Sequence, residues 1–219
     1  MKKLLALLLA LLMLLTMVAC AADESDDVDG VKVDEQETKL EKKVELSRGK
    51  IQSGVYVSEF LEIQFTKPDS WVYSSDEEIA QMVSLSVEAI AGDRFKEALE
   101  KTETLYDMMV VDSVTRSNII VSYENLTKTL STNITMDQYV EALKSQLKNV
   151  TGMTVTFPEN LETAKLGDTE FTKVLCTTTM QGSSMTQIYY LKKIDKYMCA
   201  VIVTVPSGYT VAQIEAMFQ

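Results

Sequence analysis

The sequence predicts an α+β fold in which an antiparallel β-sheet is flanked by helices. Segments of alternating apolar and polar residues follow one another through short turns, which is typical of antiparallel strands. Helical spacing begins after Ser75, Thr135 and Thr210, and each is followed three residues later by Glu or Gln, the pattern of a capping box. The order is strands, helices, strands, helix, strands, helix, which indicates α+β rather than a regular βα alternation.

The chain begins with the pattern of an export signal at residues 1–19. Two lysines precede an apolar run at 4–18, and a small residue stands before Cys20. The run is shorter than the roughly 20 residues that a membrane-spanning helix needs. The site resembles the bacterial lipobox, with Met17 in place of the usual Leu. We expect cleavage before Cys20 and acylation of its thiol by a palmitate-type chain. An ordinary secretory signal and an uncleaved anchor are the alternatives.

Residues 20–52 are expected to form an acidic, flexible tether that starts at the lipidated Cys20. The segment is rich in charge and poor in apolar side chains, and its one helix-like stretch, 38–46, is too short to be stable alone. The whole chain has a net charge of −11. Such a charge repels nucleic acid and anionic lipid headgroups, so we expect no nucleic-acid partner and attachment to the membrane through the lipid.

Residues 53–219 are expected to form a single domain, since a segment of this size can bury a core of its own. Its strands begin at about Gly54, and an interruption at Gly92 separates two helices. The clearest helix follows Thr135 and carries one apolar stripe. The expected strands include 61–66, 104–112, 117–124, 153–157, 185–192 and 197–205, and a last helix follows Thr210.

The cysteines predict two free, buried thiols. Cys176 and Cys199 fall on strands that are separated by the strand at 185–192. Two strand spacings are roughly 9–10 Å, which exceeds the reach of a disulfide at about 7 Å. The chain contains no histidine. This excludes Ser-His-Asp and Cys-His catalysis and removes the commonest zinc ligand.

The start of the domain resembles the PsbP/Mog-type family. The resemblance rests on Gly54-Val55-Tyr56, the strand 61–65 and the turn Pro68-Asp69-Ser70-Trp71. Domains of this type begin with two strands and a Pro-x-x-Trp turn, and they form a curved antiparallel sheet between helical layers. Small lipoproteins of this kind are common in Gram-positive anaerobes. The resemblance implies an accessory or binding role, while the family's specific activities find no matching residues here.

Four aromatic residues are candidates for a ligand groove: Trp71, Tyr73, Tyr106 and Tyr123. Aromatic side chains often line ligand pockets. The alternative is that Trp71 follows its turn into the sheet edge or the core.

Two acidic segments are weaker candidates. Residues 25–36 can be aligned with a calcium-binding loop, but Gln36 stands where a bidentate Glu is needed, so we expect no metal. Asp76, Glu77 and Glu78 could suggest acid/base chemistry, but the first turn of a helix favours acidic residues in any case. No cofactor is expected.

We therefore expect a membrane-anchored, non-enzymatic binding or accessory module on the extracytoplasmic face of a bacterial membrane. Its partner would be an envelope protein or a small ligand. One alternative is a solute-binding receptor for a transporter, although such receptors usually have two lobes and this chain has room for one. A histidine-independent hydrolase, using carboxylates or a Ser–Lys pair, is the other.

Overall fold

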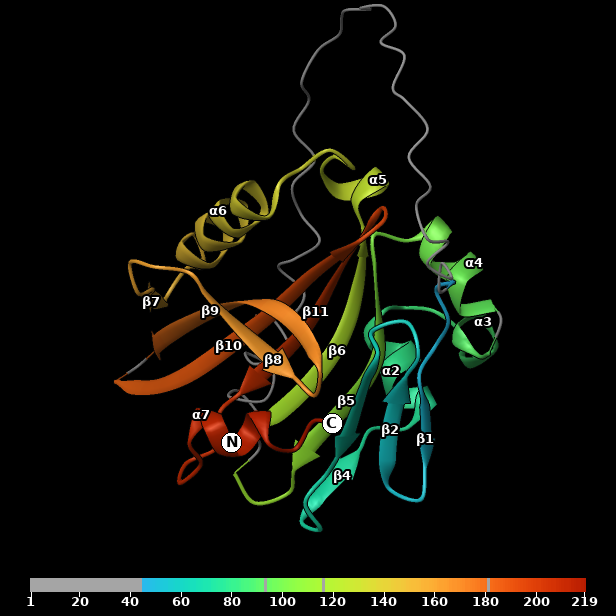
Figure 1. Cartoon of the computed structure of the whole chain (residues 1–219), viewed down its shortest axis with the longest axis horizontal. Helices are drawn as coiled ribbons and strands as arrows, with labels where there is room; N and C mark the ends of the chain where they lie inside the picture. The colour runs from blue at the N-terminus through green and yellow to red at the C-terminus, as the bar shows by residue number, and fades with distance from the viewer. Residues whose placement is uncertain (1–44, 93, 116, 181) are drawn as a thin grey trace, which may run out of the picture.

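The computed structural model describes residues 45–92, 94–115, 117–180 and 182–219. Within them, one large antiparallel sheet confirms the predicted α+β class (Figure 1). Its strands follow in the order β4-β5-β6-β11-β10-β9-β7, and β9 also pairs with β8. These strands are β4 (Trp71–Tyr73), β5 (Thr104–Asp112), β6 (Asn118–Asn125), β7 (Thr154–Thr156), β8 (Glu162–Leu166), β9 (Thr169–Met180), β10 (Ser183–Ile194) and β11 (Tyr197–Thr204).

The first strands of the domain form a separate three-stranded sheet, which the sequence did not indicate. Its strands are β1 (Lys50–Gln52), β2 (Val55–Ser58) and β3 (Ile63–Thr66). The backbone of Gln64 exchanges two hydrogen bonds of 2.8 Å with Gln219, so the end of the chain extends this sheet. Alternation along a strand predicts its buried face but does not say which strand it pairs with.

The folded part of the chain extends upstream of residue 53, where the domain was expected to begin. Leu46 is buried, Arg48 has a side-chain exposure of 12%, and β1 follows directly. The expected signal peptide, Cys20 and most of the expected tether lie in residues 1–44, outside the described residues. Among the residues that are described, no helix has both the length and the apolar character to cross a membrane.

The capping boxes predicted at Ser75, Thr135 and Thr210 are all present. In each, the side chain of the capping residue accepts a hydrogen bond from the third helical residue, whose own side chain accepts one from the cap backbone. The helices are α2 (Asp76–Met82), α3 (Val87–Ile90), α4 (Arg94–Lys101), α5 (Leu126–Thr129), α6 (Met136–Lys148) and α7 (Val211–Glu215).

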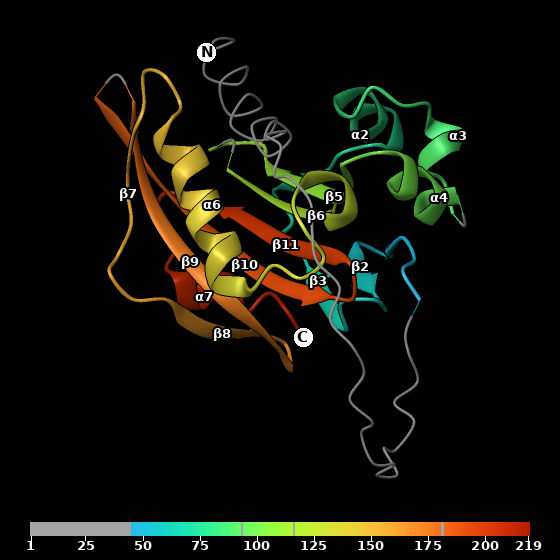
Figure 2. The same ribbon diagram turned by 90° about the horizontal axis from the view of Figure 1, so that it is seen from above.

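The two faces of the large sheet carry different layers. Glu124 and Tyr123 are neighbours in β6, so their side chains point to opposite faces. Glu124 meets Tyr139 of α6, and Figure 2 shows α6 lying across β9 and β10. Tyr123 meets Phe95 of α4, with ring centroids 5.9 Å apart. This second face also carries the three-stranded sheet and α7, so one covering layer mixes strands with helices.

The two cysteines of the domain are buried and free, as predicted. Cys176 on β9 lies in register with Gln187, which lies in register with Thr204 of β11. Thr204 is an odd number of residues from Cys199, so the two thiols point to opposite faces of the sheet. Burial raises the pKa of Cys176 to about 11, which keeps its thiol protonated at neutral pH.

We predict that residues 45–219, which contain only these two cysteines, react with a thiol reagent slowly when folded. Unfolding without a reductant should expose two reactive thiols, because the sheet keeps the sulfur atoms apart. A colorimetric thiol titration measures both states. A count below two after unfolding would contradict the structure.

Gly167 precedes β9 with φ +62°, and a methyl group there would overlap the backbone of Gln219. Gly152 also has a positive φ, +83°, but faces open space. Gly152→Ala should cost about 1 kcal/mol of unfolding free energy from backbone strain alone. Gly167→Ala should cost about 2 kcal/mol more, because the overlap adds to the strain. Urea unfolding of both variants measures the difference, and equal losses would show that the contact with Gln219 is unimportant.

Candidate functional site

The first candidate site is built on a β-bulge in β5. The pairing of β5 with β6 shifts between Tyr106 and Met108, so Asp107 is the extra residue of the bulge. A bulge re-aims the side chain that it contains. The carboxylate of Asp107 is fully buried on the face that carries the three-stranded sheet.

Donors from three separate segments converge on this carboxylate. Tyr56 of β2 donates its hydroxyl at 2.6 Å, and Tyr123 of β6 donates at 3.0 Å. The backbone N–H of Gly49 donates to both oxygens, at 2.9 and 3.1 Å. Gly49 has to be glycine, because a Cβ at this position would overlap the ring of Tyr56.

Arg48 supplies the positive charge of the group. Its Nε lies 3.8 Å from Asp107, its Nη2 donates to Asp76 at 2.6 Å, and its Nη1 donates to the carbonyl of Ile90 at 3.4 Å. We call Arg48, Gly49, Tyr56, Asp107 and Tyr123 the Asp107 cluster. It joins the segment before β1 to both sheets and to α2.

The electrostatics of the Asp107 cluster fit a structural role. Burial raises the pKa of Asp107, and the donors from Tyr56, Gly49 and Tyr123, with the charge of Arg48, oppose that rise. Burial, together with the neighbouring carboxylate, also raises the pKa of Tyr56 and of Tyr123 well above the ordinary value. Each polar atom of the carboxylate therefore has a partner inside the fold, and the tyrosines stay neutral.

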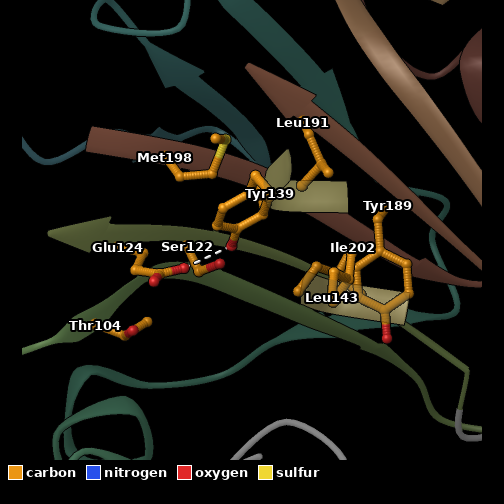
Figure 3. Close-up of a pocket in the computed structure, with 10 residues that line it drawn as sticks. Thr104, Ser122, Glu124, Tyr139, Leu143, Tyr189, Leu191, Met198 and Ile202 are labelled. Carbon is orange, nitrogen blue, oxygen red and sulfur yellow. Dashed lines mark hydrogen bonds between the residues drawn. The ribbon is translucent and has the colours of Figure 1, made fainter. Parts of the chain in front are cut away.

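A second buried carboxylate lies on the opposite face, beneath α6. Tyr139 of α6 donates its hydroxyl to Glu124 at 2.5 Å, beside a cavity of about 10 Å³ (Figure 3). Burial raises the pKa of Glu124 and the nearby Glu103 raises it further, while the hydroxyls of Thr129 and Tyr139 lower it. The residues that line this cavity are Thr104, Ser122, Glu124, Tyr139, Leu143, Tyr189, Leu191, Met198, Ala200 and Ile202.

Two larger hollows open on the surface of the described residues. One, of about 480 Å³, lies beside Arg48, Lys50 and Glu59, next to the Asp107 cluster. The other, of about 400 Å³, has an apolar wall of Met82 and Tyr106. Its rim carries Ser84, Lys101, Thr102 and Glu103. Both are large enough for a small organic molecule.

The structure does not bring the four predicted aromatic residues together in one groove. Trp71 is buried against Tyr209, with ring centroids 6.5 Å apart, which agrees with the core alternative. Tyr73 donates its hydroxyl to the carbonyl of Gly54 at 3.2 Å. Tyr123 belongs to the Asp107 cluster. Tyr106 lies in register with Ser122, on the face of α6, and it lines the 400 Å³ hollow.

The two acidic segments that the sequence offered as weaker candidates show no functional site among the described residues. Asp76, Glu77 and Glu78 form the first turn of α2, where Asp76 pairs with Arg48 and Glu78 completes the capping box. The calcium-like segment, 25–36, lies outside the described residues. Among the residues that the structure describes, no three acidic or cysteine side chains gather where they could hold a metal ion. Sequence reasoning missed Asp107, although an aspartate within an apolar strand was a visible signal.

Comparison with known proteins finds similarity to solved structures. Neither a protein-family model nor a curated protein matches the sequence. The solution structure of cyanobacterial PsbP (CyanoP) from Synechocystis sp. PCC 6803 is similar to this chain with a TM-score of 0.46 and 11% sequence identity. The match covers 80% of this chain and 94% of that chain. At this identity no property of CyanoP transfers to individual residues here.

The geometry of the Asp107 cluster predicts that loss of the Tyr56 hydroxyl lowers the stability of the domain markedly. Tyr56→Phe should lower the unfolding free energy by about 2 kcal/mol, because it removes a donor from a buried carboxylate. Tyr73→Phe is the matched control: its hydroxyl is half-buried and bonded to a carbonyl, so the loss should be about 0.5 kcal/mol. Urea unfolding at pH 7 measures both, and equal effects would contradict the assigned role of Asp107.

Proposed function

We propose that this protein is an extracytoplasmic lipoprotein whose α+β domain acts as a non-enzymatic binding or accessory module. The observation that carries the non-enzymatic part is the use made of the buried ionisable groups. Asp107 is engaged by Arg48 and two tyrosines, and Glu124 by Tyr139, so both acidic side chains are occupied by contacts between layers. The chain has no histidine to act as a general base at neutral pH.

The anchoring part of the proposal is supported by the sequence of the first twenty residues. Two lysines, an apolar run and a cysteine after a small residue have the order of a lipoprotein signal. The acidic segment that follows would separate the domain from the headgroups, since its charge and low apolar content oppose both folding and contact with anionic lipid.

The binding part is supported by the hollow beside Tyr106. It combines apolar side chains with a cation, Lys101, and an anion, Glu103, at its rim. A few polar groups around an apolar wall are typical of small-molecule sites. The ligand class that fits is a small amphipathic molecule with both a positive and a negative group.

Lipid attachment is tested on the full chain expressed in a bacterium that is fed an alkyne-labelled fatty acid. We expect the wild-type chain to carry the label and to fractionate with membranes, and Cys20→Ala to lose both. Cys176→Ala is the control and should retain both properties, because this thiol is buried in the domain. An unlabelled wild-type chain would refute the anchor.

Ligand binding is tested by thermal unfolding of residues 45–219 against amino acids, peptides, sugars, lipids and ions. A ligand that binds the folded state raises Tm. We expect Tyr106→Ala to abolish the ligand-induced shift and the control Tyr73→Ala to preserve it, each measured against its own ligand-free Tm. If no compound shifts Tm, crosslinking in intact cells should capture a protein partner, and failure of both would contradict a binding role.

A further inference from the structure

Among the described residues, helix α6 contacts the large sheet through an apolar stripe and the hydroxyl of Tyr139. Val140, Leu143 and Leu147 are buried against the sheet. The hydroxyl of Tyr139 donates a hydrogen bond of 2.5 Å to Glu124. Loops at 130–135 and 149–153 connect α6 to its neighbours, so the helix can move without breaking a strand.

The surroundings of Glu124 lack a compensating cation among the described residues. The groups that face it are the hydroxyls of Tyr139 from α6 and Thr129 from α5, and the carboxylate of Glu103 before β5. On β10, Lys193 instead donates to the carbonyls of Thr132 and Ile134, at 2.6 and 2.9 Å. The same strand contributes Tyr189, whose burial raises its pKa and keeps it neutral.

A carboxyl group in such a position is favoured in its neutral form, because burying its ionised form without a cation costs free energy. Burial without an opposite charge penalises the ionised form. The contrast with Asp107 is direct, because that carboxylate has Arg48 and three donors. Beside Glu124, the hydroxyl of Thr104 is buried and has no hydrogen-bond partner among the described residues. The wall of the small cavity therefore contains a polar group whose hydrogen bond is not formed.

We propose that α6 is a pH-dependent cover of the large sheet, which neutral Glu124 holds closed through Tyr139 and which ionisation of Glu124 releases. When α6 opens, Glu124 reaches water and can carry its charge without cost. Opening would uncover the apolar residues beneath the helix and join the cavity to solvent. This device depends on the contacts of α6 and not on the membrane anchor.

The direction in which the opening of α6 depends on pH follows from the pKa of Glu124 in the closed and open states. The pKa of Glu124 is raised in the closed state and should return to the ordinary value of a glutamate once the side chain is exposed. Below that value the closed state keeps its full stability. Between the two pKa values the opening constant rises about tenfold per pH unit, and it levels off above the closed-state pKa.

Hydrogen exchange of the α6 amides tests this proposal, using the chain without residues 1–19 between pH 4 and 9. At each pH the exchange rate is divided by that of Glu124→Gln, which cancels the intrinsic pH dependence of exchange. We expect the ratio to rise with pH and then level off for α6, and to stay constant for α4, which lies away from α6 (Figure 2). A constant ratio for α6, or an equal rise in α4, would overturn the proposal.

A second variant serves if Glu124→Gln does not fold. Glu103→Gln removes the neighbouring charge that raises the pKa of Glu124, so the exchange of α6 should level off at lower pH and at a smaller value. The matched control is Glu141→Gln on the exposed side of α6, where the carboxylate pairs with Lys144 at 2.9 Å. Its pH midpoint should equal that of the wild type, and a shift as large as that of Glu103→Gln would contradict a role for Glu124.

Discussion

The buried carboxylate of Asp107 is the interaction that joins the separate parts of this domain. Its donors come from β2 and β6 and from the segment before β1, and Arg48 continues the network to Asp76 of α2. Removing one partner from such a group leaves a buried charge or a buried donor unsatisfied, which costs more than the bond itself contributes. The position of the small sheet on the large one therefore depends on the bulge that aims Asp107 inward.

The two faces of the large sheet are stabilised in different ways. On one face, a carboxylate with a cation and several donors joins the sheets. On the other, Glu124 has two hydroxyls and no cation among the described residues, while apolar side chains provide most of the contact with α6. The first arrangement surrounds the ionised carboxylate with donors and a cation, whereas the second leaves ionised Glu124 without a cation among the described residues. A single sheet thus carries one permanent layer and one that can respond to its surroundings.

The functional proposal brings these structural features together with the start of the chain. In that proposal, the predicted export signal, the predicted acidic tether and the internally engaged acidic side chains of the domain all support a binding module. The hollow beside Tyr106 is lined by the ends of α2 and α4 and by β5, whose Tyr106 points to the face of α6. Movement of α6 and binding near Tyr106 would therefore concern the same side of the sheet.

The sequence alone determined the local structure. The capping boxes at Ser75, Thr135 and Thr210 were predictable because capping depends on residues three apart, and antiparallel strands followed from alternation and short turns. Separation of Cys176 and Cys199 also followed from strand order. The tertiary structure decided which strands share a sheet, the inclusion of Arg48 in the domain, and the meeting of Tyr56 with Asp107 across 51 residues. Such contacts depend on packing between distant segments, and the periodicity of a single segment carries no information about its partners.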